Sequence, residues 1–209
     1  KLSTVKTVNG KKPVFFGLDA KNDFYAKNIK NSGDGKVLAT LCFDNNNIDV
    51  EIPAIGTYMV TNALAAAAAG KLLGLTDEEI ANGVASYKTV GSRANVINTG
   101  KIKIIDDCYN ANPTSVRASL DTLSNLDGRK VAILGDMKEL GSEELKLHFD
   151  TGVYAKSKDI GTVITVGELA KELAKGADGK AFDTIEDAKS EILKTIKSGD
   201  VVLVKASHS

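Results

Sequence analysis

The second half of the chain alternates short apolar runs with segments of helical length, and this alternation most constrains the fold. The candidate strands are residues 101–105, 131–134, 162–165, 180–182 and 201–204. The candidate helices between them are residues 113–124, 142–157, 168–175 and 185–197. Strands separated by helices of this length are joined by right-handed crossovers into a parallel sheet that is covered on both faces. The sequence therefore predicts a Rossmann-like α/β domain in this half.

The first half shows a different pattern. Its β-rich runs are residues 13–18, 36–43 and 48–52. The run Asp44-Asn45-Asn46-Asn47 is a turn signal, so the last two strands are expected to form a hairpin. An alanine-rich helix is expected from Gly56 to about Leu73, closed by Gly74. A second helix should follow the capping-box pattern that starts at Thr76.

Composition limits the classes of partner. The 27 basic and 27 acidic residues cancel, so the chain shows no electrostatic footprint for nucleic acid or an anionic membrane. No apolar run has membrane-spanning length, and the first residues have no signal-peptide layout. Cys42 and Cys108 are isolated, which suits a reducing cytoplasm. His148 and His208 form no metal cluster, and we interpret His148 as structural.

The most polar stretch directly follows the strand at 101–105. It reads Asp106-Asp107-Cys108-Tyr109-Asn110-Ala111-Asn112-Pro113 and leads into a helix. Polar groups at the carboxyl end of a parallel strand, facing a helix N-terminus, lie where open α/β sheets bind ligands. A solvated turn with Asx caps is the alternative, and the residues alone leave both open.

The loop also has the pattern Asp-Asp-x-Tyr-Asn-Ala-Asn-Pro-x-Ser, which resembles the signature of the Mur ligases, the ATP-dependent amide ligases of peptidoglycan precursor synthesis. Further similar segments follow the family's order: Ile55-Gly56, Asn62-Ala63-Leu64-Ala65-Ala66, Gly91-Ser92-Arg93, Leu134-Gly135-Asp136-Met137-Lys138-Glu139-Leu140-Gly141 and Val204-Lys205-Ala206-Ser207-His208-Ser209. The resemblance covers nearly the whole chain. It implies that residues 1–92 are the second part of a central ATPase domain and that residues 93–209 are the family's C-terminal domain.

The resemblance implies an ATP site formed by Asn62, Arg93, Asp107, Tyr109 and Asn112. In the family, the residue matching Asn62 contacts the adenine, and the one matching Arg93 reaches the nucleotide from the hinge. An arginine there can fork onto phosphate oxygens. Asp107 fits the ribose, because a carboxylate can accept from two hydroxyls. Two plainer interpretations stay open: Asn62 bonded to a neighbouring loop, and Arg93 as a solvated linker charge.

One departure concerns the helix that carries Asn62. The family more often has His-Asn where this chain has Tyr58-Met59, and a thioether cannot donate the hydrogen bond of an amide. No ligand contact is therefore carried over to that pair. Asp106 is expected to orient Asp107.

The substrate side is assigned by resemblance as well. It implies candidates near D-alanyl-D-alanine at the ligand edge of the sheet: Asp136, Met137, Lys205 and Ser207. Asp136 can equally be a helix cap. In the reaction implied, ATP phosphorylates the carboxylate of UDP-MurNAc-tripeptide, and the amine of D-alanyl-D-alanine attacks the acyl phosphate. The branch implied is the one that adds this dipeptide, acting as a monomer.

A phosphate loop is missing from the sequence. No Gly-x-x-x-x-Gly-Lys-[Ser/Thr] occurs, so we expect ATP phosphates and Mg²⁺ to be bound mainly by regions outside it, and we assign no catalytic or metal-binding residue. The family's Lys-Gly-Ser-Arg-Ser-Met segment is incomplete, with Ala206 and His208 substituted. We interpret the chain as a fragment of an enzyme that does not turn over alone.

Two other hypotheses belong to different classes. One is a non-catalytic nucleotide-binding Rossmann module, which the missing phosphate loop favours and the alanine-rich helix disfavours. The other is a sister ligase, such as a folylpolyglutamate synthase. The Tyr-Asn-Ala-Asn-Pro and Gly-Asp-Met runs argue against the sister ligase.

Overall fold

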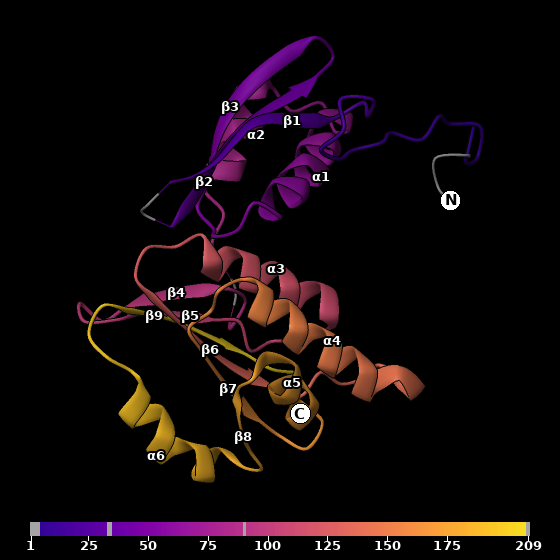
Figure 1. Cartoon of the computed structure of the whole chain (residues 1–209). Helices are drawn as coiled ribbons and strands as arrows, with labels where there is room; N and C mark the ends of the chain where they lie inside the picture. The colour runs from indigo at the N-terminus through magenta and orange to yellow at the C-terminus, as the bar shows by residue number, and fades with distance from the viewer. Residues whose placement is uncertain (1–4, 33–34, 90, 208–209) are drawn as a thin grey trace. The chain divides into compact units, whose positions relative to one another are not determined.

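The computed structural model describes residues 5–32, 35–89 and 91–207, and the chain divides into two compact units, Lys1–Lys88 and Thr89–Ser209 (Figure 1). The boundary expected between residues 92 and 93 lies slightly further along the chain and stays a prediction. Val90 of the expected linker and His208 of the last motif lie outside the described residues.

The sheet of the first unit is antiparallel. Its strands are β1 (Tyr25–Ser32), β2 (Lys36–Phe43) and β3 (Asn46–Ile52), in the order β1-β2-β3. The predicted hairpin is confirmed, because Phe43 pairs with Asn46. Asp44 and Asn45 between them have φ of 47° and 61°, as a two-residue type I′ turn requires.

The strand predicted at residues 13–18 was wrong. That segment makes only an isolated bridge, between Phe16 and Phe24, and the strand is β1 instead. β1 reads YAKNIKNS, and a register irregularity between Lys27 and Lys30 interrupts its pairing with β2. The irregularity and the exposed lysine and asparagine side chains hide the alternation that marks a strand.

Two helices cover this sheet, α1 (Met59–Leu72) and α2 (Asp77–Ala85). Gly74 has φ of 88°, and the Leu75 amide donates to the Gly70 carbonyl at 3.0 Å, which closes α1 as predicted. The capping box at Thr76 is also confirmed, since its hydroxyl accepts from the Glu79 amide while Glu79 accepts in return. Sheet and helices share one hydrophobic core.

The second unit is a six-stranded sheet in the order β4-β5-β9-β6-β7-β8. The strands are β4 (Asn95–Asn98), β5 (Lys103–Asp106), β6 (Arg129–Gly135), β7 (Thr162–Val166), β8 (Lys180–Phe182) and β9 (Asp200–Lys205). All neighbours pair in parallel except β4 with β5. The predicted parallel sheet is confirmed. The antiparallel edge strand β4 was missed, because it is short and its Val96 and Ile97 are exposed.

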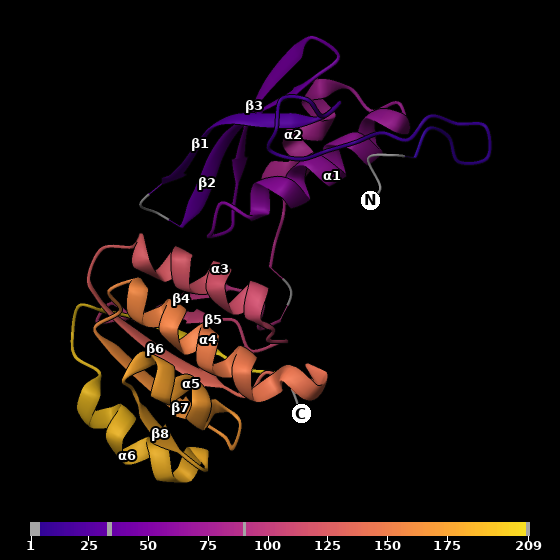
Figure 2. The ribbon, with the colours of Figure 1, turned by 45° about the vertical axis from the view of Figure 1, so that its right-hand side comes forward.

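Helices lie on both faces of this sheet. They are α3 (Pro113–Ser124), α4 (Glu144–Ser157), α5 (Ala170–Ala177) and α6 (Ile185–Thr195). Figures 1 and 2 show α3, α4 and α5 side by side on one face and α6 on the other. A 3₁₀ turn, Gly141–Glu143, precedes α4, so the helix begins two residues later than the start expected at residue 142. In the part of the chain described, no helix is long and apolar enough to cross a membrane.

The position of β9 matters most for function. Although β9 comes after β8 in the sequence, it lies between β5 and β6. Because these three strands are parallel, the segments that follow them meet at the same carboxyl edge of the sheet.

Candidate functional site

Three segments from distant parts of the sequence meet at this edge: residues 107–111 after β5, residues 136–138 after β6 and residues 205–207 at the end of β9. Backbone hydrogen bonds tie them together. The Asp107 amide donates to the Val204 carbonyl at 2.9 Å, and the Ser207 amide donates to the Asp136 carbonyl at 3.0 Å. We call these three segments the loop cluster.

Asp107 has a half-buried carboxylate held by three donors. Its Oδ1 accepts from the Ala94 amide at 3.1 Å. Its Oδ2 accepts from the Ser119 hydroxyl at 2.8 Å and from the Lys205 ammonium at 2.7 Å. A carboxylate has about four lone-pair positions, so Oδ1 keeps one of them for a further donor.

Lys205 has only 2 % of its side chain exposed. Besides Asp107 Oδ2, its ammonium donates to the Asn110 carbonyl at 2.8 Å and to the Asp107 carbonyl at 3.4 Å. An ammonium has three N–H groups, so all of them point into the loop. The contact with D-alanyl-D-alanine expected from Lys205 stays a prediction, and this geometry offers it no free donor.

Ser207 joins all three segments through its hydroxyl. The oxygen accepts from the Lys138 amide at 3.1 Å and from the Ala111 amide at 3.3 Å. The hydroxyl proton faces Asn110 Oδ1 at 3.2 Å and the Ala111 carbonyl at 3.1 Å. Since a hydroxyl has one proton and two lone pairs, Ser207 is saturated by the loop cluster itself.

The segment Gly135-Asp136-Met137 is held by hydrogen bonds to α5 and to His148 of α4. Asp136 Oδ1 accepts from the Ala170 amide at the start of α5, at 2.8 Å. Met137 is fully buried, and its amide donates to His148 Nε2 at 2.9 Å. His148 Nδ1 lies 2.7 Å from the Glu144 carbonyl, so the hydrogen bonds assign the proton to Nδ1. This geometry agrees with the structural role expected for His148.

The segment before β4 lies against the loop cluster. The Tyr109 amide donates to the Ser92 carbonyl at 3.0 Å. The Arg93 guanidinium carbon lies 3.5 Å from the centroid of the Tyr109 ring, a cation–π contact. Ala94, which bonds Asp107, has φ of 52°, an uncommon conformation for a residue other than glycine. Both Arg93 and Tyr109 remain exposed.

Asn112 is the N-cap of α3. Its side-chain oxygen accepts from the Ser115 amide at 2.9 Å, and Ser115 Oγ accepts from the Asn112 amide at 3.1 Å. Pro113 occupies the first helical turn, where a missing N–H has no cost. The Asx-capped turn that the sequence left open is therefore present, next to the carboxylate of Asp107.

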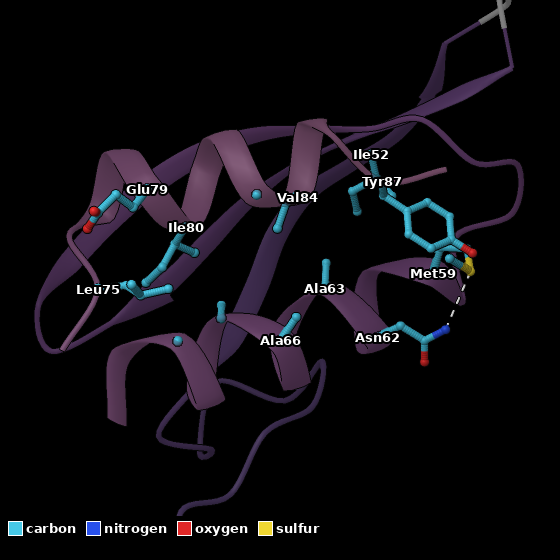
Figure 3. Close-up of a pocket in the computed structure, with 13 residues that line it drawn as sticks. Ile52, Met59, Asn62, Ala63, Ala66, Leu75, Glu79, Ile80, Val84 and Tyr87 are labelled. Atoms are coloured by element: carbon cyan, nitrogen blue, oxygen red, sulfur yellow. Dashed lines mark hydrogen bonds between the residues drawn. The ribbon is translucent and has the colours of Figure 1, made fainter. Parts of the chain in front are cut away.

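Asn62 belongs to the first unit and lies on α1. Its Nδ2 lies 3.4 Å from the Met59 sulfur, so the methionine that departs from the family's pattern is its neighbour. Figure 3 shows Asn62, Met59 and Tyr87 gathered at one end of a pocket between α1 and α2. The pocket has a volume of about 330 Å³, and its walls are mostly apolar, with Ala63 and Val84 among them.

Cys108 is not a candidate nucleophile. Burial, and after it the nearby Asp106 carboxylate, raise the pKa of the Cys108 thiol to about 11. The thiol lies 3.4 Å from the Val204 carbonyl, to which it donates. The thiolate is the reactive form of cysteine, so this thiol is inert near neutral pH.

Fold and loop cluster define the second unit as a Rossmann-like α/β protein, a class that binds ligands at the carboxyl edge of its sheet. Residues 92–208 match the family described as "Mur ligase, glutamate ligase domain", and residues 2–70 match the "Mur ligase middle domain". The chain belongs to the Mur ligase family.

Several relatives carry the same activity in their names. The UDP-N-acetylmuramoyl-tripeptide--D-alanyl-D-alanine ligase of Bacillus subtilis is 34% identical over 204 residues, covering 92% of this chain and 44% of that protein. A MurF structure from Acinetobacter baumannii has a TM-score of 0.85 at 31% identity, covering 93% of this chain and 43% of that one. MurF from Thermotoga maritima in complex with ADP has a TM-score of 0.80 at 27% identity, covering 93% and 45%. This chain spans less than half the length of these relatives.

Sequence reasoning missed two partners of Asp107. Ser119 lies on α3 one turn after Ser115. No sequence motif distinguishes it, and only its burial in the structure singles it out. The Ala94 amide is a backbone group, and no side-chain pattern reveals it. The structure brings together all the predicted residues of the second unit except Arg93 and Asn112 in one hydrogen-bonded cluster, and those two lie at its border.

Proposed function

We propose that this chain is the carboxyl-terminal part of an ATP-dependent amide ligase that adds D-alanyl-D-alanine to UDP-MurNAc-tripeptide. The similarity to the Bacillus subtilis ligase over 92% of this chain carries the proposal. The loop cluster supports it, because it presents hydrogen-bonding groups at the edge of the sheet where a ligand is expected.

For the second unit, we propose that Asp107 accepts a ribose hydroxyl of ATP on Oδ1. An arrangement in which each carboxylate oxygen accepts one ribose hydroxyl fits less well, because Oδ2 already accepts from Ser119 and Lys205. Arg93, exposed and stacked on Tyr109, would meet phosphate oxygens, since a guanidinium stays charged at any working pH. Tyr109 and Asn112 would then fix Arg93 and the start of α3.

For the first unit, we propose that Asn62 contacts the adenine. The base is planar and largely apolar, and it carries hydrogen-bonding groups only on its edges. The pocket beside Asn62 has apolar walls and an amide at its end. Such a pocket can hold an aromatic ring and read one polar edge.

On the substrate side, Asp136, Met137, Lys205 and Ser207 are proposed to form the edge near D-alanyl-D-alanine. Met137 and Lys205 are buried, so neither would touch the dipeptide directly. The Asp136 carboxylate is half-buried and caps α5. Its other oxygen, Oδ2, is the candidate for a direct contact.

ATP would supply the phosphoryl group that converts the tripeptide carboxylate into an acyl phosphate, with Mg²⁺ neutralising phosphate charge. The dipeptide amine then displaces phosphate and forms the amide bond. The described residues contain no group of three His, Cys, Asp or Glu side chains able to hold a metal ion. We therefore assign no residue of this chain to Mg²⁺.

Location and assembly remain proposals as well. We propose a cytoplasmic protein, because Cys42 and Cys108 are both free and unpaired cysteines suit a reducing compartment. We propose that it acts as a monomer.

The test is phosphate release by the complete ligase that contains this chain. We expect release to require ATP, UDP-MurNAc-tripeptide and D-alanyl-D-alanine together. Release with glutamate in place of the dipeptide would favour the sister ligase. Nucleotide binding without turnover would favour the non-catalytic module. Residues 1–209 alone should read background in the same assay.

A further inference from the structure

Lys205 is a buried cation in the loop cluster. Its ammonium spans the turn after β5, because it bonds the Asp107 carboxylate at 2.7 Å and the Asn110 carbonyl at 2.8 Å. One side chain from β9 therefore closes both ends of this turn. An isolated buried ammonium is costly, and here the Asp107 carboxylate and two carbonyls compensate it.

The lysine leaves Asp107 in one orientation. With Oδ2 bonded to Lys205 and Ser119, the other oxygen, Oδ1, points to the Ala94 amide at 3.1 Å. The same turn carries Tyr109, whose ring supports Arg93. The groups proposed to meet the nucleotide thus depend on a turn that Lys205 fixes.

We propose that Lys205 is a positioning residue for the nucleotide, acting through Asp107 and the 107–110 turn, and that it makes no direct contact with D-alanyl-D-alanine. This inference rests on the proposed function, because it assumes that Asp107 meets ATP. It differs from the assignment of Lys205 to the dipeptide, because it predicts a change in nucleotide affinity and none in the KM of the dipeptide.

The chain contains a matched control at the other end of β9. Asp200, the first residue of this strand, is 2 % exposed and pairs with Arg129 at 2.6 Å. Arg129 lies at the start of β6, at the amino edge of the same sheet. Removing either cation takes the charged partner away from a carboxylate that is at least partly buried, so both variants are expected to lose stability. Of the two cations, only Lys205 belongs to the loop cluster.

The experiment compares Lys205→Met with Arg129→Leu in the complete ligase. Binding of a non-hydrolysable ATP analogue is measured by calorimetry, and the melting temperature by scanning calorimetry. We expect both variants to melt lower. Lys205→Met should bind the analogue roughly tenfold to hundredfold more weakly, and Arg129→Leu should bind within about twofold of the unaltered protein. The KM for D-alanyl-D-alanine should stay within about twofold in both.

Ser119→Ala keeps the test decisive if Lys205→Met does not fold. This change removes a hydroxyl that bonds Asp107 at 2.8 Å, and alanine suits the helix interior. It should weaken analogue binding several-fold, because Asp107 loses one of the hydrogen bonds that hold it. Unchanged analogue binding in both Lys205→Met and Ser119→Ala, or a rise confined to the dipeptide KM, overturns the proposal.

A second measurement separates this inference from the proposed function. Hydrogen exchange at the amides of residues 107–111 should accelerate in Lys205→Met and not in Arg129→Leu. If the unaltered protein binds no ATP, the proposed function fails, whereas accelerated exchange still supports the turn-fixing role. Unchanged exchange in a folded Lys205→Met protein overturns that role directly.

Discussion

The two ends of β9 carry buried charge pairs with opposite exposure. At the amino end, the Asp200 carboxylate is the buried partner, at 2 % exposure, and Arg129 reaches solvent at 39 %. At the carboxyl end, Lys205 is the buried partner, at 2 %, and Asp107 is exposed at 14 %. The comparison teaches that each pair encloses one member completely, while only the other member is open to solvent.

The two pairs also differ in the elements that their hydrogen bonds connect. Arg129 Nε and Nη2 bond the two Asp200 oxygens at 2.8 and 2.6 Å, and the Lys197 amide adds a third bond at 2.6 Å. At the amino edge of the sheet, this pair joins the start of β6 to the start of β9, and Arg129 also donates to the Thr195 carbonyl at the end of α6 at 2.6 Å. The Lys205 pair instead joins the turn after β5 to α3 through Ser119. We interpret the Arg129–Asp200 pair as stabilising the fold. We interpret the Lys205–Asp107 pair as stabilising the fold and also fixing the geometry of the loop cluster.

The largest expected effect comes from Asp107→Ala. This change leaves the buried Lys205 ammonium without its carboxylate, which should cost about 3–5 kcal/mol of unfolding free energy. ATP affinity should also fall by roughly tenfold to hundredfold. Urea denaturation and calorimetric titration with an ATP analogue measure the two effects in the complete ligase that contains this chain. As a control, Asp200→Ala should lose stability and keep ATP affinity. Equal affinity in Asp107→Ala and the unaltered protein would sink the ribose assignment.

The second prediction concerns the Arg129–Asp200 pair at the amino end of β9 and the pH dependence of the stability it provides. Burial alone would raise the pKa of Asp200, but the Arg129 guanidinium and the Lys197 amide together hold it below its ordinary value of 3.8. The pair's stability is therefore fully present above pH 3.8 and is lost as the pH falls through the lowered pKa. Urea unfolding between pH 5 and pH 2 should show this loss. Arg129→Leu should show a flatter profile, and an identical profile would contradict the pairing.

The third prediction concerns helix caps and is smaller. Asn112→Ala and Thr184→Ala each remove an N-cap that accepts from a first-turn amide, at a cost of about 1 kcal/mol. Thr184 follows β8, at the far side of the sheet from β5. Denaturation should therefore show similar losses, whereas only Asn112→Ala should weaken nucleotide binding. Equal nucleotide affinity in both variants would leave Asn112 as a cap alone.

The fourth prediction concerns thiol reactivity and involves neither stability nor nucleotide affinity. With a pKa of about 11 against an ordinary 9.0, Cys108 should form thiolate about a hundredfold less often than an exposed thiol near neutral pH. Alkylation in a Cys42→Ala background should report this directly. Lys205→Met should speed the reaction by loosening the turn, and Arg129→Leu should not. Fast alkylation of the unaltered protein would contradict the buried position of the thiol.

Much of this arrangement was predictable from the sequence. The alternation of apolar runs and helices identified five strands of the second unit, and the capping pattern at Thr76 and Pro113 fixed two helix starts. These signals are local, because a strand or cap depends on neighbouring residues. β1 and β4 were missed, because β1 has an irregular register and β4 is a short exposed edge strand.

The contacts within the site were less predictable. The polar turn at Asp107 and the residues Asp136, Lys205 and Ser207 were recognised individually, and the parallel sheet implied that they share an edge. Their partners could not be found in the same way. Whether Lys205 faces a ligand or Asp107 depends on β9 lying between β5 and β6, a sheet order that no short segment of sequence encodes.

The order of the strands also has a consequence for biosynthesis. β9 is central in the sheet, yet it is the last of the described strands to leave the ribosome. Until then, β5 and β6 each have an unpaired edge toward the gap, and such edges invite pairing with other chains. The newly made protein must therefore keep two apolar half-sheets apart from its neighbours until the final strand arrives and joins them.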